Sequence, residues 1–285
     1  MCEKSVTDDW QPVNCGKKTI IAAVRLLVVA VWILQPCSSR LNAQEPEVRI
    51  AAASDLRFVI PELARQAQKE RHVRVNVIFD SSGNSFAQIQ NGAPYDLFLS
   101  ADIEYPQRLE AAGLAEPGSL YEYAVGQIVL WMPAGTKMDM TRQGWTTLLN
   151  SDVQKIAIAN PKHAPYGRAA VAALRKAGIY DRVKAKLVYA ENILQAAQFV
   201  QSGNAQAGII SRSLALSPEM KEGQAWEIPA ETYPPVEQAA VVLKSAGNKQ
   251  AAKDFLEFMK SESGRRILEK CGFSASATSS RAAAP

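Results

Sequence analysis

Histidine and cysteine are both scarce in this chain of 285 residues. The sequence contains two histidines and four cysteines, and three of the cysteines lie within the first 37 residues. A transition-metal site needs several imidazole or thiolate ligands at short spacings, and the sequence has no such cluster. An imidazole base could come only from His72 or His163, and no serine lies in a G-x-S-x-G elbow. A metal-binding carrier and a hydrolase that uses Ser54 or Ser82 therefore remain only as weakly supported alternatives.

Strong net charge is also missing from the chain. Lys and Arg number 32 against 28 Asp and Glu, which gives a formal net charge of +4. Because no stripe of basic residues interleaved with aromatic ones is present, we expect no nucleic-acid partner. Apolar residues make up 47% and charged residues 21%, a composition typical of a globular protein with a substantial core. The length suits one large domain or two of ordinary size.

Long hydrophobic runs are confined to the N-terminus. Two lysines precede the run TIIAAVRLLVVAVWIL, which only Arg25 interrupts, and a polar segment with Ala43 near its end follows. This order is typical of a secretory signal peptide, so we expect residues 1–43 to direct export to the periplasm, with an uncleaved membrane anchor as the alternative. Cleavage near Ala43 would leave Cys271 as the single cysteine, so the mature chain would form no internal disulfide.

From residue 47 onward, short runs of strand-forming residues alternate with helical patterns. This alternation predicts an α/β fold in which mostly parallel sheets carry helices on both faces. Pro61 predicts either a kink in the first helix or a helix that begins just before it. The runs that we expect to be strands are VRIAA (48–52), VRVNVIF (73–79), DLFLS (96–100), KIAIA (155–159), AKLVY (185–189) and QAGII (206–210). The glycines expected to end helices are Gly92, Gly113, Gly178 and Gly203.

The junctions between strands and helices carry small and hydroxyl-bearing residues. Ser54, Ser81, Ser82 and Asn192 are good helix N-caps, and each of them alone is explained by ordinary capping. In an open α/β sheet, however, these junctions lie together at the carboxyl ends of the strands, where ligands bind. Each helix start offers unpaired N–H groups and a partial positive charge. Several such junctions around one cleft would form an anion site made of neutral donors.

Several segments, in order along the chain, resemble one known family. The combination of AAASDL with the serine-rich loop and DLFLSAD is more specific than any single fragment. The segments are AAASDL (51–56), FDSSGNSFAQIQNGAPYDLFLSAD (79–102), NPKHAPYG (160–167), AENILQA (190–196), AGII (207–210) and KCGF (270–273). Over nearly all of 47–273 the sequence resembles the periplasmic molybdate-binding proteins that serve ABC transporters, within the bacterial extracellular solute-binding proteins.

The resemblance implies a two-lobed periplasmic binding protein of type II-like fold. Each lobe would be a mostly parallel sheet flanked by helices, with the ligand cleft between the lobes. One lobe would comprise 47–125 plus 236–273 and the other 126–235, while the small-residue ending predicts a disordered tail over 274–285. The resemblance implies molybdate, and tungstate with it, as the ligand, and ABC permease subunits in the membrane as partners. It implies a monomer with no enzymatic activity and no cofactor, and sulfate or thiosulfate is the alternative ligand.

The resemblance also implies which residues bind the anion, that is, the metal oxyanion molybdate. Ser54 and Ser82 would contribute hydroxyl groups, and Tyr166 and Ile193 would contribute backbone amides. Known members also use a tyrosine hydroxyl at the position of Ser211, where the shorter side chain cannot reach as far. We therefore hypothesise that the Tyr166 phenol replaces that hydroxyl.

Charged residues near these junctions have other expected roles. Asp55 is expected to face solvent from the first helical turn, where a negative charge is favourable. If it faces inward instead, phosphate becomes a candidate ligand, because a protonated anion needs an acceptor. Arg168 and Arg212 are expected at solvated helix starts. Asp96 is expected to lead into a strand and Asp102 to cap a helix rather than to bind a metal.

Overall fold

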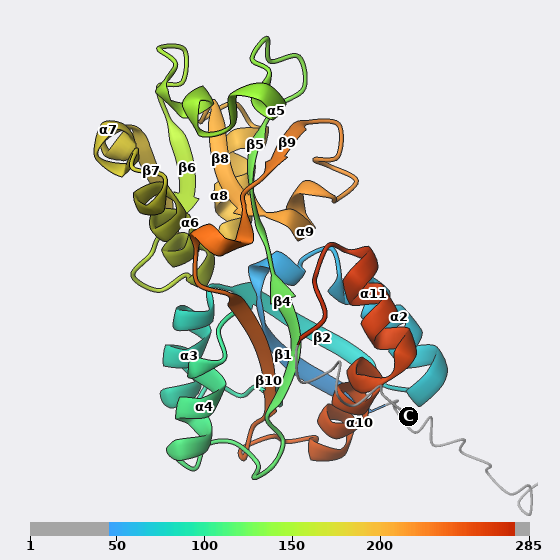
Figure 1. Ribbon diagram of the computed structural model, residues 1–285. Helices are drawn as coiled ribbons and strands as arrows, with labels where there is room; N and C mark the ends of the chain where they lie inside the picture. Colours follow the sequence, from blue (N-terminus) through green and yellow to red (C-terminus); the bar gives the residue numbers. More distant parts are fainter. Residues whose placement is uncertain (1–45, 277–285) are drawn as a thin grey trace, which may run out of the picture. The chain divides into compact units, whose positions relative to one another are not determined.

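Two five-stranded sheets organise the computed structural model, which describes residues 46–276 (Figure 1). The predicted signal segment, residues 1–43, lies outside the described residues, as do residues 277–285 of the predicted tail. Within 46–276, no helix combines the length and the apolar character that a membrane crossing requires.

The first sheet has the strand order β2-β1-β3-β10-β4. β1 pairs in parallel with β2 and β3, whereas β10 runs antiparallel to both β3 and β4. Helices α2, α10 and α11 cover one face, and α3 and α4 cover the other (Figure 1). The strands are β1 (Glu47–Ala53), β2 (Arg74–Asp80), β3 (Leu97–Ser100), β4 (Tyr121–Gly126) and β10 (Val236–Val242). The helices are α2 (Ile60–Arg71), α3 (Ser82–Gln90), α4 (Glu104–Ala111), α10 (Lys249–Lys260) and α11 (Glu262–Lys270).

The second sheet has the order β7-β6-β8-β5-β9. β6 is parallel to β7 and β8, and β5 is antiparallel to β8 and β9. The strands are β5 (Ile128–Met132), β6 (Ile156–Ala159), β7 (Leu187–Ala190), β8 (Ala207–Ser211) and β9 (Gln224–Glu227). The helices are α5 (Met140–Gln143), α6 (Pro165–Lys176), α7 (Tyr180–Val183), α8 (Ile193–Gln201) and α9 (Arg212–Ala215). Single 3-10 turns are η1 (Ser54–Leu56), η2 (Gly144–Leu149), η3 (Lys184–Lys186) and η4 (Ala230–Thr232).

We call each sheet with its own helices a lobe, the first lobe being built on β1 and the second on β6. Both belong to one compact unit. The alternation of side chains along β3 explains why the first lobe has two apolar layers: Leu97 and Leu99 pack toward α2 and α10, while Phe98 packs toward α3 and α4. The predicted α/β fold with two flanked sheets is confirmed. The strands that lead into helices are parallel, and antiparallel β5 and β10 make each sheet mixed.

Two short connections join the lobes. β4 ends at Gly126 in the first sheet and β5 begins at Ile128 in the second, so only Gln127 separates them. The return passes through Pro234 and Pro235 just before β10. Gly126 has no room for a side chain, because an added Cβ would collide with the Tyr166 hydroxyl from the second lobe.

Three local predictions can be compared with the coordinates. α2 begins at Ile60, directly before Pro61, which confirms the helix start rather than the kink. The four helix-ending glycines all have positive φ, between 69° and 82°. The predicted tail is wrong at its start, because Ser274 exchanges two backbone hydrogen bonds of 2.9 Å with Val125 and Ser276 is fully buried.

Candidate anion-binding site

Ser54 stands where the first strand of the first lobe turns into η1. The alanines Ala51, Ala52 and Ala53 before it are almost completely buried, which lets this turn approach the second lobe closely. The Ser54 hydroxyl oxygen accepts a hydrogen bond of 3.4 Å from the backbone N–H of Leu194, in the first turn of α8. Within residues 46–276 this is its only recorded hydrogen bond, so the hydroxyl proton remains available to a ligand.

Ser82 occupies the first turn of α3, after the second strand. Ser81 is the N-cap, as predicted, and its side chain accepts a 3.3 Å bond from the N–H of Asn84. The buried Ser82 hydroxyl accepts a 2.9 Å bond from the N–H of Ala101, and no acceptor for its own proton is recorded among the described residues. Like Ser54, Ser82 thus offers a free proton.

The second lobe contributes two helix starts. α6 begins at Pro165, so Tyr166 is its second residue, and α8 begins at Ile193 after its cap Asn192. The first four N–H groups of a helix have no acceptor within the helix, and the amides of Tyr166 and Ile193 belong to this class. Both residues are buried.

The four predicted contacts lie around one cavity between the lobes. Its volume is about 10 Å³, which is room for roughly one water molecule, so the two lobes are closed on one another here. None of the residues that line it is lysine, arginine or histidine. Whether these groups contact an anion stays a prediction. The lining residues are Ala53, Ser54, Asp55, Asp80, Ser81, Ser82, Ala101, Ala164, Pro165, Tyr166 and Ile193.

Direct contacts between the lobes hold this closure. The N–H of Gly83 donates to the carbonyl of His163 over 3.0 Å, and the Ser81 hydroxyl lies 3.0 Å from His163 Nδ1. Gly83 is required for this approach, because an added Cβ would come within 2.6 Å of the His163 carbonyl oxygen.

The prediction that Asp55 faces solvent is wrong. Asp55 is completely buried and lines the cavity. Its Oδ2 accepts a 2.7 Å hydrogen bond from the Tyr166 hydroxyl and a 2.6 Å bond from Gln238 Nε2. Burial raises the pKa of Asp55 from its ordinary 3.8 to about 6, against the lowering effect of the hydrogen bonds from Gln238 and Tyr166. Gln238 was missed because it lies 183 residues away in β10, and no local sequence signal connects the two.

This pairing also changes the expected role of the Tyr166 side chain. Its single hydroxyl proton goes to Asp55, and its oxygen accepts from Gln238 Nε2 at 2.8 Å, so in this arrangement the phenol has no proton to offer a ligand. Ser211, at the position of the family tyrosine, caps α9 and lies 3.0 Å from the Ser213 hydroxyl. In this arrangement neither side chain has a hydroxyl proton left for a ligand, and the replacement of the family hydroxyl by Tyr166 stays a hypothesis.

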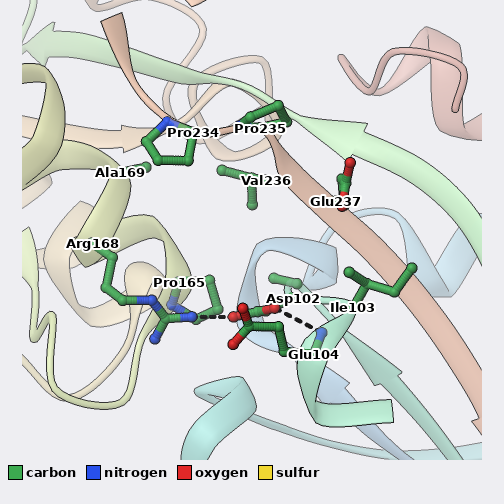
Figure 2. A pocket seen from close by; sticks show the side chains of 11 residues that line it. Asp102, Ile103, Glu104, Pro165, Arg168, Ala169, Pro234, Pro235, Val236 and Glu237 are labelled. Atoms are coloured by element: carbon green, nitrogen blue, oxygen red, sulfur yellow. Dashed lines mark hydrogen bonds and ion pairs between the residues drawn. The ribbon is translucent and has the colours of Figure 1, made fainter. Parts of the chain in front are cut away.

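A second cavity, of about 410 Å³, adjoins the first and shares Ala101 and Pro165 with it (Figure 2). Arg168 from α6 and Asp102 from the first lobe point toward one another there and form an ion pair (Figure 2). Asp102 also accepts a 2.9 Å bond from the N–H of Glu104, but the N-cap of α4 is Ile103, so Asp102 lies one residue before the cap position expected for it. Arg168 lies in the first turn of α6 with 41% of its side chain exposed, as expected, and it also pairs across the lobes.

The other charged residues considered in the sequence already have partners. Asp96, directly before β3 as predicted, accepts hydrogen bonds from the backbone N–H groups of Arg49, Gly247 and Asn248. Arg212 pairs with Glu227. No group of three or more potential metal ligands occurs in the part of the chain that the structure describes.

Comparison with known proteins decides the family. Residues 48–274 match the family described as bacterial extracellular solute-binding protein. The chain belongs to this family. Membership places it among binding components of transport systems rather than among enzymes, against the hydrolase alternative. The fold and the family agree with a ligand site between two lobes.

Several solute-binding proteins that are similar to this chain have names that state their ligand. It is 36% identical to the molybdate-binding protein ModA of Rhodobacter capsulatus, over 82% of this chain and 90% of that protein. It is also 36% identical to ModA of Azotobacter vinelandii, over 81% and 91%. The solved periplasmic molybdate-binding protein of Azotobacter vinelandii superposes with a TM-score of 0.75 at 34% identity, covering 80% of this chain and 99% of that one.

Proposed function

We propose that this chain captures molybdate, and tungstate with it, between the two lobes at the position of this cavity and delivers it to an ABC permease. The observation that carries the proposal is the donor set: helix starts from both lobes and two free hydroxyl protons meet at a cavity that no basic side chain lines. The similarity to proteins named as molybdate-binding supplies the choice of ligand.

Neutral donors suit a dianion that must be held and then released. A tetrahedral oxyanion loses its water on entry, so its oxygens need replacement hydrogen bonds. Each bond to a charged acceptor contributes about 1.5–3 kcal/mol. The two hydroxyls with the amides of Tyr166 and Ile193 would thus contribute roughly 6–12 kcal/mol before the entropic cost of association. After release, no buried lysine or arginine is left without a partner.

Donors from both lobes make the closed form the ligand-binding form. Ser54 and Ser82 come from the first lobe, and Tyr166 and Ile193 from the second. A ligand that needs all four shifts the population toward closure, which the permease would then read. In this proposal the lobes are 47–125 with 236–273, and 126–235, and they hinge at the two connections. Residues 1–43 would export the protein to the periplasm, where it would act as a monomer.

Calorimetric titration of the chain from Gln44 onward tests the proposal. Molybdate and tungstate should bind with similar affinity and at least tenfold more tightly than sulfate or thiosulfate. Ser54→Ala should weaken molybdate binding, whereas Ser202→Ala, at an exposed helix end, serves as the matched control. Preferential binding of sulfate or thiosulfate would assign the alternative carrier function. Failure to bind any of these oxyanions would overturn the proposal.

A further inference from the structure

Asp55 places a buried carboxylate at a cavity whose four predicted anion contacts are all hydrogen-bond donors. The side chain is completely buried, and its two oxygens have different surroundings. Oδ2 receives the hydrogen bonds from Tyr166 and Gln238, whereas Oδ1 is buried and accepts no hydrogen bond of good geometry from the described residues; the backbone amides of Asp55 and Leu56 also lower the pKa of the carboxyl group, though less than those two side chains. A buried ionised oxygen without a partner is costly, and a proton on it would remove that cost.

The hydrogen-bond network fixes which oxygen has a free position. Gln238 Oε1 accepts a 2.7 Å bond from the Tyr123 hydroxyl, which orients the amide so that Nε2 faces Asp55. Nε2 also donates to the Tyr166 oxygen, and the Tyr166 proton points to Oδ2. Because both donors converge on Oδ2, Oδ1 is the oxygen that takes up a proton or faces a ligand.

The charged groups on the surrounding elements do not neutralise Asp55. Asp80, at the end of β2, is the other carboxylate that lines the cavity, and it accepts from the Ser81 N–H at 2.7 Å. On α6, Arg168 is paired with Asp102 at the neighbouring cavity. On α9, Ser213 presents a hydroxyl that donates to the Asp55 carbonyl at 2.9 Å.

The remaining neighbours are neutral or turned to other partners. β4 and β10 present Tyr123 and Gln238, and α8 presents the apolar Ile193. Burial raises the pKa of Tyr123 well above its ordinary value, so this phenol stays neutral. In the loop before α6, Lys162 is exposed and His163 lies against Ser81 and Glu191. An incoming dianion would therefore meet carboxylates without any cation lining the cavity.

We propose that Asp55 is the protonated acid when the oxyanion is bound, so that capture of each dianion takes up one proton from solvent onto Oδ1. The Oδ1–H group then becomes a further donor toward the anion. This inference rests on the proposed function and deepens it, because it makes Asp55 the residue that selects the protonation state of the ligand. An ionised Asp55 would instead suit an anion that carries its own proton, such as hydrogen phosphate.

Two physical effects act in the same direction. Burial in the closed form raises the pKa of Asp55 to about 6 with no ligand present, even though the hydrogen bonds from Gln238 and Tyr166 lower it. A dianion in the same cavity raises it further, because like charges at short distance disfavour ionisation. Above about pH 6 the free protein is ionised and the complex is protonated, so molybdate affinity should fall about tenfold for each pH unit.

Titration calorimetry in two buffers of different ionisation enthalpy tests this inference. At pH 7.5 the wild-type protein should take up close to one proton for each molybdate bound, and its Kd should rise about tenfold between pH 7 and pH 8. Asp55→Asn should bind molybdate with no proton uptake and a flat pH profile. The matched control Asp80→Asn, which also removes a carboxylate from the cavity lining, should retain the pH dependence.

The possible results distinguish a failure of this inference from a failure of the proposed function. Molybdate binding by the wild type without proton uptake, or with a flat pH profile, would overturn the inference and leave the proposed function standing. Hydrogen phosphate, which brings its own proton, should gain about tenfold relative to molybdate for each pH unit, and a constant ratio would also contradict the role of Asp55. A protein that binds no oxyanion at any pH would contradict the proposed function itself. The wild-type proton count decides the question even if a variant fails to fold.

Discussion

Replacing Gly83 with alanine should weaken ligand binding without weakening the fold. The added Cβ would lie 2.6 Å from the His163 carbonyl oxygen, 2.9 Å from its Cβ and 3.0 Å from its Cα. Two of these three atoms belong to the backbone of the second lobe, so the clash cannot be relieved by a side-chain rotation. The lobes must separate at this point, which also lengthens the 3.0 Å bond from the Gly83 N–H to that carbonyl.

The magnitude follows from the two contributions. Overpacking of a close contact costs about 1–3 kcal/mol, and the hydrogen bond contributes about 1 kcal/mol more. Because both contributions exist only in the closed form, Kd should rise by about 30-fold to several hundredfold. In the open form the change should be neutral or stabilising, since alanine favours a helix over glycine by about 1 kcal/mol and Gly83 lies in the first turn of α3.

Two measurements together check this reasoning. Calorimetry should show weaker molybdate binding by Gly83→Ala, while thermal unfolding of the unliganded variant should show an unchanged or higher Tm. Gly247→Ala is the matched control, because an added Cβ there meets its nearest atoms at 3.4 Å and 3.8 Å, away from the cavity. An unchanged Kd for Gly83→Ala would refute the argument that these lobes must meet for binding.

Three other substitutions test separate parts of the site. Ser82→Ala removes a donor to a charged acceptor, so Kd measured by calorimetry should rise about tenfold or more; a smaller change would remove Ser82 from the contact set. Arg168→Gln breaks the pair with Asp102, and because the Arg168 side chain is 41% exposed, stopped-flow release should accelerate less than about fivefold and lose part of its salt dependence. For the unliganded protein, the raised pKa of Asp55 means that ionisation of this carboxyl group opposes folding. The penalty in folding free energy is absent below pH 3.8, the ordinary pKa of the group, and grows as the pH rises to about 6. Above that pH it reaches about 3 kcal/mol. Asp55→Asn should therefore raise Tm by roughly 6–12 °C at pH 8 but not at pH 4, and equal Tm gains at both pH values would contradict the assignment.

The parts of the fold that could be predicted are those encoded by neighbouring residues. Side-chain periodicity predicted the strands that lead into helices, and Gly92 predicted the end of α3. Both features depend only on local backbone geometry. The placement of Ser54 and Ser82 at helix starts also followed from local residue types. The antiparallel course of β10 was not predicted, since a strand's direction depends on which distant strand it joins.

The part of the site that could not be predicted depends on long-range pairing. Asp55 has the sequence context of a solvated first-turn carboxylate, and its burial results from Tyr166 and Gln238, which lie 111 and 183 residues away along the chain. The ion pair between Asp102 and Arg168 arises in the same way across 66 residues. Neither pairing leaves a pattern in the surrounding sequence, so local rules assigned Asp55 and Arg168 to solvated helix starts and Asp102 to a helix cap.

The single residue between β4 and β5 sets how such a molecule can move. Gln127 joins β4 and β5, each of which is held by hydrogen bonds in its own sheet. The second connection, before β10, contains two consecutive prolines whose φ angles are fixed by their rings. Few backbone torsions in the two connections are free to rotate, so the two lobes are joined by a stiff hinge rather than by a flexible linker. The lobes would then open along a single direction, and each closure would cost little conformational entropy of the chain. Repeated binding and release of the ligand would therefore bring the two lobes back into the same alignment.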